Sequence, residues 1–116
     1  MSSQPGSGAG SAPAEALASV GAFEAFEAEH RALGFDQVLV REWGPGHATG
    51  EHRHPFDVRA LVVKGGFVLG CQGQERPLGP GDRFELDAEV LHTEVYGPEG
   101  ATFWVARRAP PPREAP

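Results

Sequence analysis

The chain has 116 residues, of which 40% are hydrophobic and 22% charged, and its formal net charge is -6. This length fits one domain, and the acidic charge argues against nucleic acid or an anionic membrane surface as a partner. A single cysteine, Cys71, excludes a disulfide framework within the chain. No apolar run reaches the ~20 residues of a membrane helix, and the first residues lack a secretory signal. We therefore expect a cytoplasmic protein.

Both ends of the chain are predicted to be disordered. Residues 1–16 are mainly Ser, Gly, Ala and Pro, with almost no large apolar side chains to offset the entropy of ordering. Residues 109–116, with the sequence APPPREAP, are typical of an extended polyproline-type tail. The folded domain is therefore predicted over residues 17–108.

One amphipathic helix is predicted within SVGAFEAFEAEHRALGF, which covers residues 19–35. Ser19 has the residue type of an N-cap, and Gly34 stands where helices commonly end. His30 is predicted to pack the helix against the domain rather than bind a metal, because no partner lies near it in the sequence. It belongs to a set of four side chains that recur at helical spacing on one face: Phe23, Phe26, His30 and Leu33.

After the helix the pattern changes to period two, beginning with DQVLVREW at residues 36–43. This rhythm, in a chain with 16 Gly and 11 Pro, predicts an all-β sandwich or barrel. The first strand and the helix could also serve a homodimer interface. Turns are predicted at 44–46, 65–66, 79–81 and 97–100, and further strands at 51–54, 57–64, 66–71, 83–86, 90–96 and 101–107.

The stretch GHATGEHRHPFDVRALVVKGG contains two histidines one residue apart, His52 and His54, in a predicted strand. Residues i and i+2 of a strand point to the same face, so both imidazoles could bind one metal ion. His92 lies in another strand-like segment, EVLHTEVYG. Three imidazoles converging inside a barrel would leave coordination positions open for water or substrate. Taken alone, the His-x-His pair also fits an exposed turn.

The same stretch resembles the first sequence motif of the cupin superfamily. That motif has a Gly, five residues, His-x-His, three or four residues, Glu, six residues and Gly. Here five residues separate Gly46 from His52, Val58 occupies the Glu position, and Gly65 closes the motif.

A second resemblance to the cupins lies in GDRFELDAEVLHTEVY, after a PGD turn at residues 80–82. The second cupin motif has Gly, five residues, Pro, one residue, Gly, two residues, His, three residues and Asn. The spacing is kept here, with His92 in the His position. The remaining motif positions are filled by Gly81, Asp87, Glu89 and Tyr96.

The resemblance implies a cupin-type jelly-roll barrel, preceded here by one helix. It also implies a divalent metal ion held by His52, His54 and His92. Cupins commonly bind iron, manganese, nickel or zinc at this site, with Glu as the fourth ligand. Val58 has no ligand atom, so three hypotheses stay open.

In the first hypothesis the three histidines alone hold the metal, as in some cupin dioxygenases, and Fe(II) is the natural ion. In the second another carboxylate substitutes. Asp57 adjoins Val58 but points to the opposite face unless a bulge intervenes, whereas Glu94 shares the face of His92. In the third no metal binds, and the pocket recognises a small molecule as the sensing half of arabinose-responsive-type regulators does. The chain lacks the helix-turn-helix segment of a complete regulator.

Glu94 and Tyr96 are the predicted catalytic residues. They follow His92 at two-residue steps, so all three side chains share one face. Glu94 could bind the metal, act as a general base or orient a ligand histidine, and Tyr96 could contact the substrate. Glu94 could equally be an exposed strand residue. The sequence thus predicts a dioxygenase- or isomerase-like metal-binding cupin that acts on or binds a small organic molecule, or a ligand-binding module without metal.

Other conspicuous side chains have simpler expected roles. His47 is predicted to lie on the surface of a loop. Cys71 is predicted to be a small buried hydrophobic residue. The aromatic residues Trp43, Phe84, Phe103 and Trp104 are predicted to pack in the core or line the barrel, which would make the pocket apolar.

Overall fold

The computed structural model describes residues 21–109. The predictions for residues 1–16 and 110–116 lie outside this range. The described chain forms one helix and six strands, which confirms an all-β domain preceded by a helix. In chain order the elements are α2 (Ala22–Ala32), β1 (Gln37–Trp43), β2 (Ala48–His52), β3 (Asp57–Cys71), β4 (Gln74–Leu78), β5 (Arg83–Leu86) and β6 (His92–Arg108).

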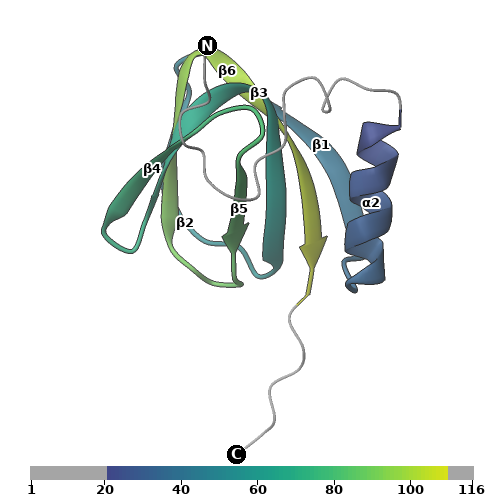
Figure 1. Ribbon diagram of the computed structural model, residues 1–116. Coiled ribbons are helices and arrows are strands. Elements are labelled where there is room, and N and C mark those ends of the chain that lie inside the picture. Colours follow the sequence, from purple (N-terminus) through teal and green to yellow (C-terminus); the bar gives the residue numbers. More distant parts are fainter. Residues whose placement is uncertain (1–20, 110–116) are drawn as a thin grey trace, which may run out of the picture.

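The six strands pair in one antiparallel sheet that folds into two layers (Figure 1). The first layer has the order β1, β6, β3, β5 and uses the C-terminal part of β6 with the N-terminal part of β3. The second has the order β2, β6, β3, β4 and uses the other halves of the two long strands. The main core lies between the layers and includes Val62, Phe67 and Phe103. This arrangement is the predicted jelly-roll barrel.

The two long strands bend at glycines instead of ending there. We expected turns at 65–66 and 97–100, which would have divided each strand in two, and this expectation is wrong. Gly65 pairs with Ala101 in the ladder between β3 and β6, next to a register shift. Its φ is 71°, and a methyl group there would overlap the carbonyl oxygen of Gly100. Glycine therefore marks the corner where a continuous strand passes from one layer to the other.

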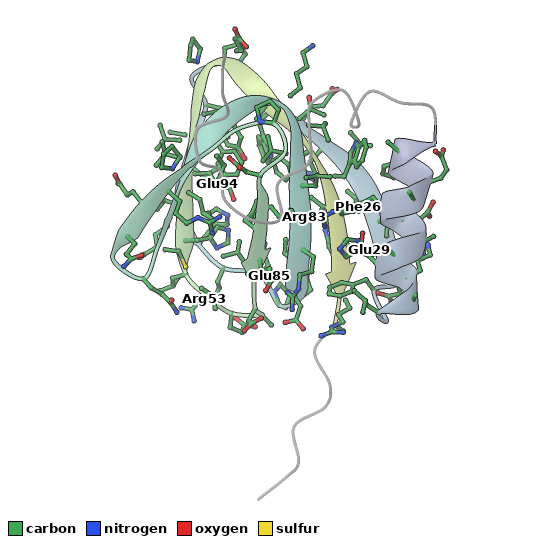
Figure 2. All side chains as sticks on the ribbon, viewed as in Figure 1. Phe26, Glu29, Arg53, Arg83, Glu85 and Glu94 are labelled. Atoms are coloured by element: carbon green, nitrogen blue, oxygen red, sulfur yellow. The ribbon has the colours of Figure 1, made fainter. Side chains whose placement is uncertain are left out.

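The helix α2 covers the outer face of the first layer (Figure 1). Phe26 points from the helix toward the sheet (Figure 2) and meets Trp104 edge-on, with 5.7 Å between ring centroids. His30 is buried beside it, and its Nδ1 donates a hydrogen bond of 2.8 Å to the carbonyl oxygen of Phe26. These contacts confirm that His30 packs the helix and lies outside the histidine cluster described below.

The ends of the helix differ in how well they were predicted. Ser19, the expected N-cap, lies outside the described residues, and the helix begins at Ala22 after Gly21. Gly34 follows the last turn with a φ of 97°, as its predicted stop position requires. Leu33 was expected on the packed face but is 58% exposed, because the chain leaves the helical path at this residue.

Two edge strands differ from the predicted ranges. β2 covers Ala48–His52 instead of 51–54, and Pro55, which has no N–H to donate, follows shortly after its end. β4 was not predicted because Pro77 interrupts its pattern, yet an edge strand tolerates proline.

None of the helices within residues 21–109 combines the length and the apolar character that crossing a membrane demands.

Candidate metal centre and cavity

Three histidines from distant parts of the chain meet between the two layers. His52 ends β2, His92 begins β6, and the two residues are direct partners in the ladder. His54 follows two residues after His52. One ring nitrogen from each histidine lies within 4.8 Å of the other two, and the ring centroids of His52 and His92 are 4.2 Å apart. The structure therefore brings the three imidazoles together.

His54 reaches this cluster from a loop. We expected it in one strand with His52, which is wrong because β2 ends at His52. Two other contacts hold His54 instead. The N–H of Glu89 donates a hydrogen bond of 2.7 Å to its carbonyl oxygen, and its ring stacks on Phe56 with 5.0 Å between centroids. A loop fixed in this way can present a ligand as firmly as a strand.

Hydrogen bonds to backbone carbonyls orient two of the rings. Nδ1 of His52 lies 2.8 Å from the carbonyl oxygen of Gly50, and Nδ1 of His92 lies 3.0 Å from that of Val90. A carbonyl oxygen can only accept, so each Nδ1 carries the proton and donates. Nε2 of each ring then faces the cluster, and Nε2 of His92 is buried with the Glu94 carboxylate 3.3 Å away as its ion-pair partner. This pattern is typical of histidines that bind metal through Nε2.

Burial lowers the pKa of His54, and the nearby rings of His92 and His52 lower it further. His54 is therefore uncharged near neutral pH. Only an uncharged imidazole has a lone pair for a metal ion. The electrostatics of the cluster thus favour the form of this residue that binds metal.

Glu94 adds a carboxylate to the cluster and lies inside the barrel (Figure 2). Its Oε2 is 3.3 Å from Nε2 of His92 and 3.8 Å from Nε2 of His52. The hydroxyl group of Tyr96 donates a hydrogen bond of 2.6 Å to its Oε1. Burial by itself would raise the pKa of Glu94, but His92 and the Tyr96 hydroxyl together hold that pKa below its usual value. Glu94 is therefore ionised despite its burial.

The pKa values of the two neighbours of this carboxylate move in the same direction. Burial would lower the pKa of His92, but the facing Glu94 carboxylate and the Val90 carbonyl raise it above the ordinary value. Burial raises the pKa of Tyr96, and the adjacent Glu94 raises it further. Tyr96 thus stays protonated at any physiological pH and serves Glu94 as a donor.

A cavity of about 450 Å³ opens beside the cluster. That volume suits a small organic molecule. Glu94 and the three histidines line it, whereas Tyr96 is not among the lining residues and lies behind Glu94. The apolar part of the wall consists of Trp43, Phe56, Val58, Phe84, Leu86, Phe103 and Val105.

Comparison with known proteins places this geometry in context. No protein-family profile matches the sequence. Among curated proteins, the chain is 32% identical over 69 residues to dimethylsulfoniopropionate lyase DddW of Ruegeria pomeroyi. The match covers 59% of this chain and 45% of the lyase, so the chain spans about half the length of this relative.

Solved structures match over a similar share of the chain. KdgF from Halomonas sp. superposes with a TM-score of 0.53 at 26% identity, covering 61% of this chain and 67% of KdgF. An RmlC-like cupin from Shewanella frigidimarina superposes with a TM-score of 0.55 at 23% identity, covering 63% and 66%. The described domain has the cupin fold. Its barrel and the spacing of both motifs agree with the family that the sequence resembles.

The cupin motifs clarify which carboxylate approaches the histidines. Val58, in the usual Glu position, is buried and lines the cavity. Asp57 is not among the residues lining the cavity, and it accepts hydrogen bonds from the Ala88 N–H and from Arg108, at 2.8 and 3.2 Å. Among the described carboxylates that form ion pairs, Glu94 alone contacts the histidine cluster. This cupin thus brings its carboxylate from the strand of His92.

The donor set of this cupin fits a divalent metal ion. Two ligands at ~2.1 Å from one ion lie at most ~4.2 Å apart. The three nitrogens lie within 4.8 Å of one another, so the rings would move slightly closer to hold one ion. The buried Nε2 of His92 is a polar atom that a metal ion would satisfy. The three histidines therefore have the composition and spacing of a metal site.

Two arginines on the cavity wall were missed by the sequence analysis. Arg41 lies on β1 and Arg107 near the end of β6, and both line the cavity of the cupin. Each guanidinium stacks on an aromatic ring, Arg41 on Trp43 at 5.0 Å and Arg107 on Phe56 at 4.8 Å. Alternation along β1 was a usable signal, because Arg41 shares the face of Trp43, but the inward face could not be assigned.

The remaining residues singled out in the sequence lie outside the cluster. His47 is exposed in the loop after β1, as predicted, and stacks on Trp43 at 4.8 Å. Cys71 is partly buried and packs against the main core. Trp104 packs on the outer face of the first layer, under the helix.

Proposed function

We propose that this cupin is a metalloprotein in which His52, His54 and His92 hold a divalent transition-metal ion next to a small-molecule cavity. The observation that carries the proposal is the orientation of the imidazoles. Nδ1 of His52 and His92 is committed to a backbone carbonyl, so that Nε2 faces the cluster. Imidazole ligands suit iron, nickel and zinc, and manganese, the fourth candidate named from the sequence, prefers oxygen ligands.

The residues around the ion would handle a proton. When bound, the metal would polarise an oxygen of the substrate and stabilise negative charge that develops there. Glu94 is ionised and lines the cavity, so it can accept a proton from a substrate carbon or hydroxyl. Tyr96 holds Oε1 of this carboxylate, which leaves Oε2 for the proton. We therefore assign Glu94 as the general base and Tyr96 as the residue that positions it.

The reaction class we favour is a proton abstraction followed by elimination or isomerisation of a small organic molecule. Support comes from the lyase DddW, which shares 32% of residues over the matched segment and acts on dimethylsulfoniopropionate. Both reactions begin with the loss of a proton from the substrate. Glu94 lines the cavity and could accept this proton. With Fe(II), the same histidines would also suit the dioxygenase chemistry predicted from the sequence.

A ligand-binding module without turnover is the second candidate. Val58 favours it, because the position that supplies the fourth ligand in common cupins is here part of an apolar wall. Such a module would bind a small molecule in the same cavity and release it unchanged. The homodimer and the cytoplasmic location stay predictions.

Metal analysis followed by an activity test separates these candidates. The tag-free protein is reconstituted with Fe(II), Mn(II), Ni(II) or Zn(II), and its metal content is measured after desalting. About one equivalent of at least one metal is expected, and less than ~0.1 equivalent of every metal would refute the site. The loaded protein is then incubated with dimethylsulfoniopropionate, with and without O₂, and followed by proton NMR. Products indicate an enzyme, whereas line broadening of an unchanged ligand indicates a binding module.

A further inference from the structure

Two guanidinium groups face the cavity with no acidic partner among residues 21–109. Neither Arg41 nor Arg107 forms an ion pair there, although the chain has an excess of acidic residues. Four other arginines do have carboxylate partners, namely Arg31, Arg59, Arg83 and Arg108. A buried or half-buried cation without a counter-ion is costly. Glu51 and Glu94 also line the cavity but form no ion pair with either arginine, so the two arginines are where an anion from outside would be stabilised.

Cation–π contacts hold both side chains near aromatic rings, and their N–H groups have no hydrogen-bond partner among residues 21–109. Arg41 lies over the ring of Trp43 and Arg107 over that of Phe56. A guanidinium on the face of a ring keeps its N–H groups in its own plane, pointing outward along its edge. That planar edge matches the two oxygens of a carboxylate. The arginines are thus prepared for a planar anion before it arrives.

The two cations also act on each other. Burial lowers the pKa of Arg107, and the charge of Arg41 lowers it further. Arg41 also lowers the pKa of Tyr96, and Arg107 that of His54, although burial and other neighbours have larger effects on both groups. The positive charge of Arg107 therefore reaches the histidine cluster. An anion bound between the guanidinium groups would relieve this repulsion.

The distances set an upper limit for the length of the ligand. Phe56 contacts both Arg107 and His54, at 4.8 Å from the guanidinium carbon of the first and 5.0 Å from the imidazole centroid of the second. Arg107 is therefore no farther from the His54 ring than these two distances together. The cavity that both groups line has an apolar wall that includes Val58, Phe103 and Val105. A chain of a few carbon atoms would span it.

We propose that Arg41 and Arg107 form an anion-recognition site in this cavity, and that its ligand is a short-chain organic carboxylate whose other end faces His52, His54 and His92. The carboxylate binds at the guanidinium edges and the carbon chain lies on the apolar wall. The role of the far end in a reaction rests on the proposed function. The anion site itself does not, because it needs no metal.

The test uses the full chain after removal of metal with a chelator. Butyrate is titrated into the protein and binding is followed by NMR shifts and by the fluorescence of the two tryptophans. Butyramide, which has nearly the same shape without the charge, and inorganic phosphate, a compact anion without a carbon chain, are titrated in parallel. Butyrate is expected to bind about tenfold more tightly than either. Equal binding of butyramide, or binding of phosphate as tight as that of butyrate, would overturn the proposal.

Substitutions of the two cavity arginines test where butyrate binds. Arg41→Gln and Arg107→Gln are each expected to weaken butyrate binding about tenfold, and the double variant to abolish it. Arg76→Gln, on the exposed edge strand β4, is the matched control and should bind butyrate like the wild type. If a glutamine variant fails to fold, Arg41→Lys and Arg107→Lys keep the charge but lose the planar edge, and should also weaken binding. Unchanged affinity in the folded variants would refute the site.

The same proteins separate this proposal from the proposed function. The arginine variants should bind metal with the stoichiometry of the wild type, because neither residue belongs to the histidine cluster. His92→Ala should lose metal but still bind butyrate. Loss of butyrate binding in the arginine variants together with no metal binding in the wild type would leave the anion site standing and the metal centre refuted. Metal binding by the wild type together with unchanged butyrate binding in the arginine variants would refute the anion site alone.

Discussion

Tyr96 donates its hydroxyl hydrogen to Oε1 of Glu94 at 2.6 Å, from a position behind the cavity wall. Oε2 of the same carboxylate faces His92 at 3.3 Å. One oxygen is therefore held by the protein and the other is directed toward the candidate metal centre. If Glu94 is the base that we propose, this division would hold it at a fixed distance from a substrate at the candidate metal centre, as proton transfer requires.

Replacing Glu94 should separate catalysis from metal binding. Glu94→Gln keeps the size of the side chain and its contact with Tyr96 but removes the proton acceptor. We expect the metal content to stay near that of the wild type while kcat for the reaction found by the activity screen falls ~10²- to 10⁴-fold. Metal content and turnover are measured on the same samples. Full activity in Glu94→Gln would exclude Glu94 as the base, and loss of metal would show that it is a ligand.

Removing one ligand histidine should abolish tight metal binding. His92→Ala takes away a buried Nε2 that faces the cluster, and we expect the metal affinity to fall by at least ~100-fold. His47→Ala, an exposed residue outside the cluster, and His30→Ala, in the helix, should bind metal like the wild type. Calorimetric titration with Zn(II) measures all four proteins. Equal affinity of His92→Ala and the wild type would show that the cluster is not the metal site.

The barrel and the approach of His52 to His92 could be predicted because the spacing of residues within each cupin motif can be read from a single sequence. It could not predict the continuity of β3 and β6. A pair of glycines has the same local signature in a turn and in a bulge, and only the partner strand decides between them. Gly65 pairs with Ala101 across the corner, a contact between residues far apart in the chain.

The candidate site was only partly predictable for a related reason. His92 and Glu94 share a face because they lie two residues apart in one strand, and this held in β6. Arg41 and Arg107 escaped notice because the pattern of β1 does not tell which of its faces points inward. That choice depends on where α2 packs, and the helix lies against the face opposite Arg41. Long-range packing thus decides which polar residues enter the cavity.

The protein should be more stable with glycine at position 89 than with Glu89. The second cupin motif has Gly there, and Glu89 adopts a φ of 69°, in the left-handed region that disfavours residues with a side chain. We expect Glu89→Gly to raise the free energy of unfolding by ~1 kcal/mol, measured by urea denaturation. Glu99→Gly, in β6, is the control and should leave the stability unchanged or lower it. A destabilised Glu89→Gly variant would show that the side chain contributes more than the backbone strain removes.

Asp57 should make the stability depend on pH in the acid range. The hydrogen bond from the Ala88 N–H lowers the pKa of Asp57, burial opposes this, and Arg108 lowers the pKa further, so that it lies below its usual value. A lowered pKa in the folded state means that the stabilisation is complete above the unfolded pKa of ~3.9 and is lost as the pH falls through the folded value. Asp57→Asn should therefore lower the stability by roughly 2 kcal/mol at pH 7 and much less at pH 2 to 3. Thermal unfolding between pH 2 and 7 measures this difference, with the exposed Asp87→Asn as control. A gap between wild type and Asp57→Asn that stays constant over this range would refute the ionic role of Asp57.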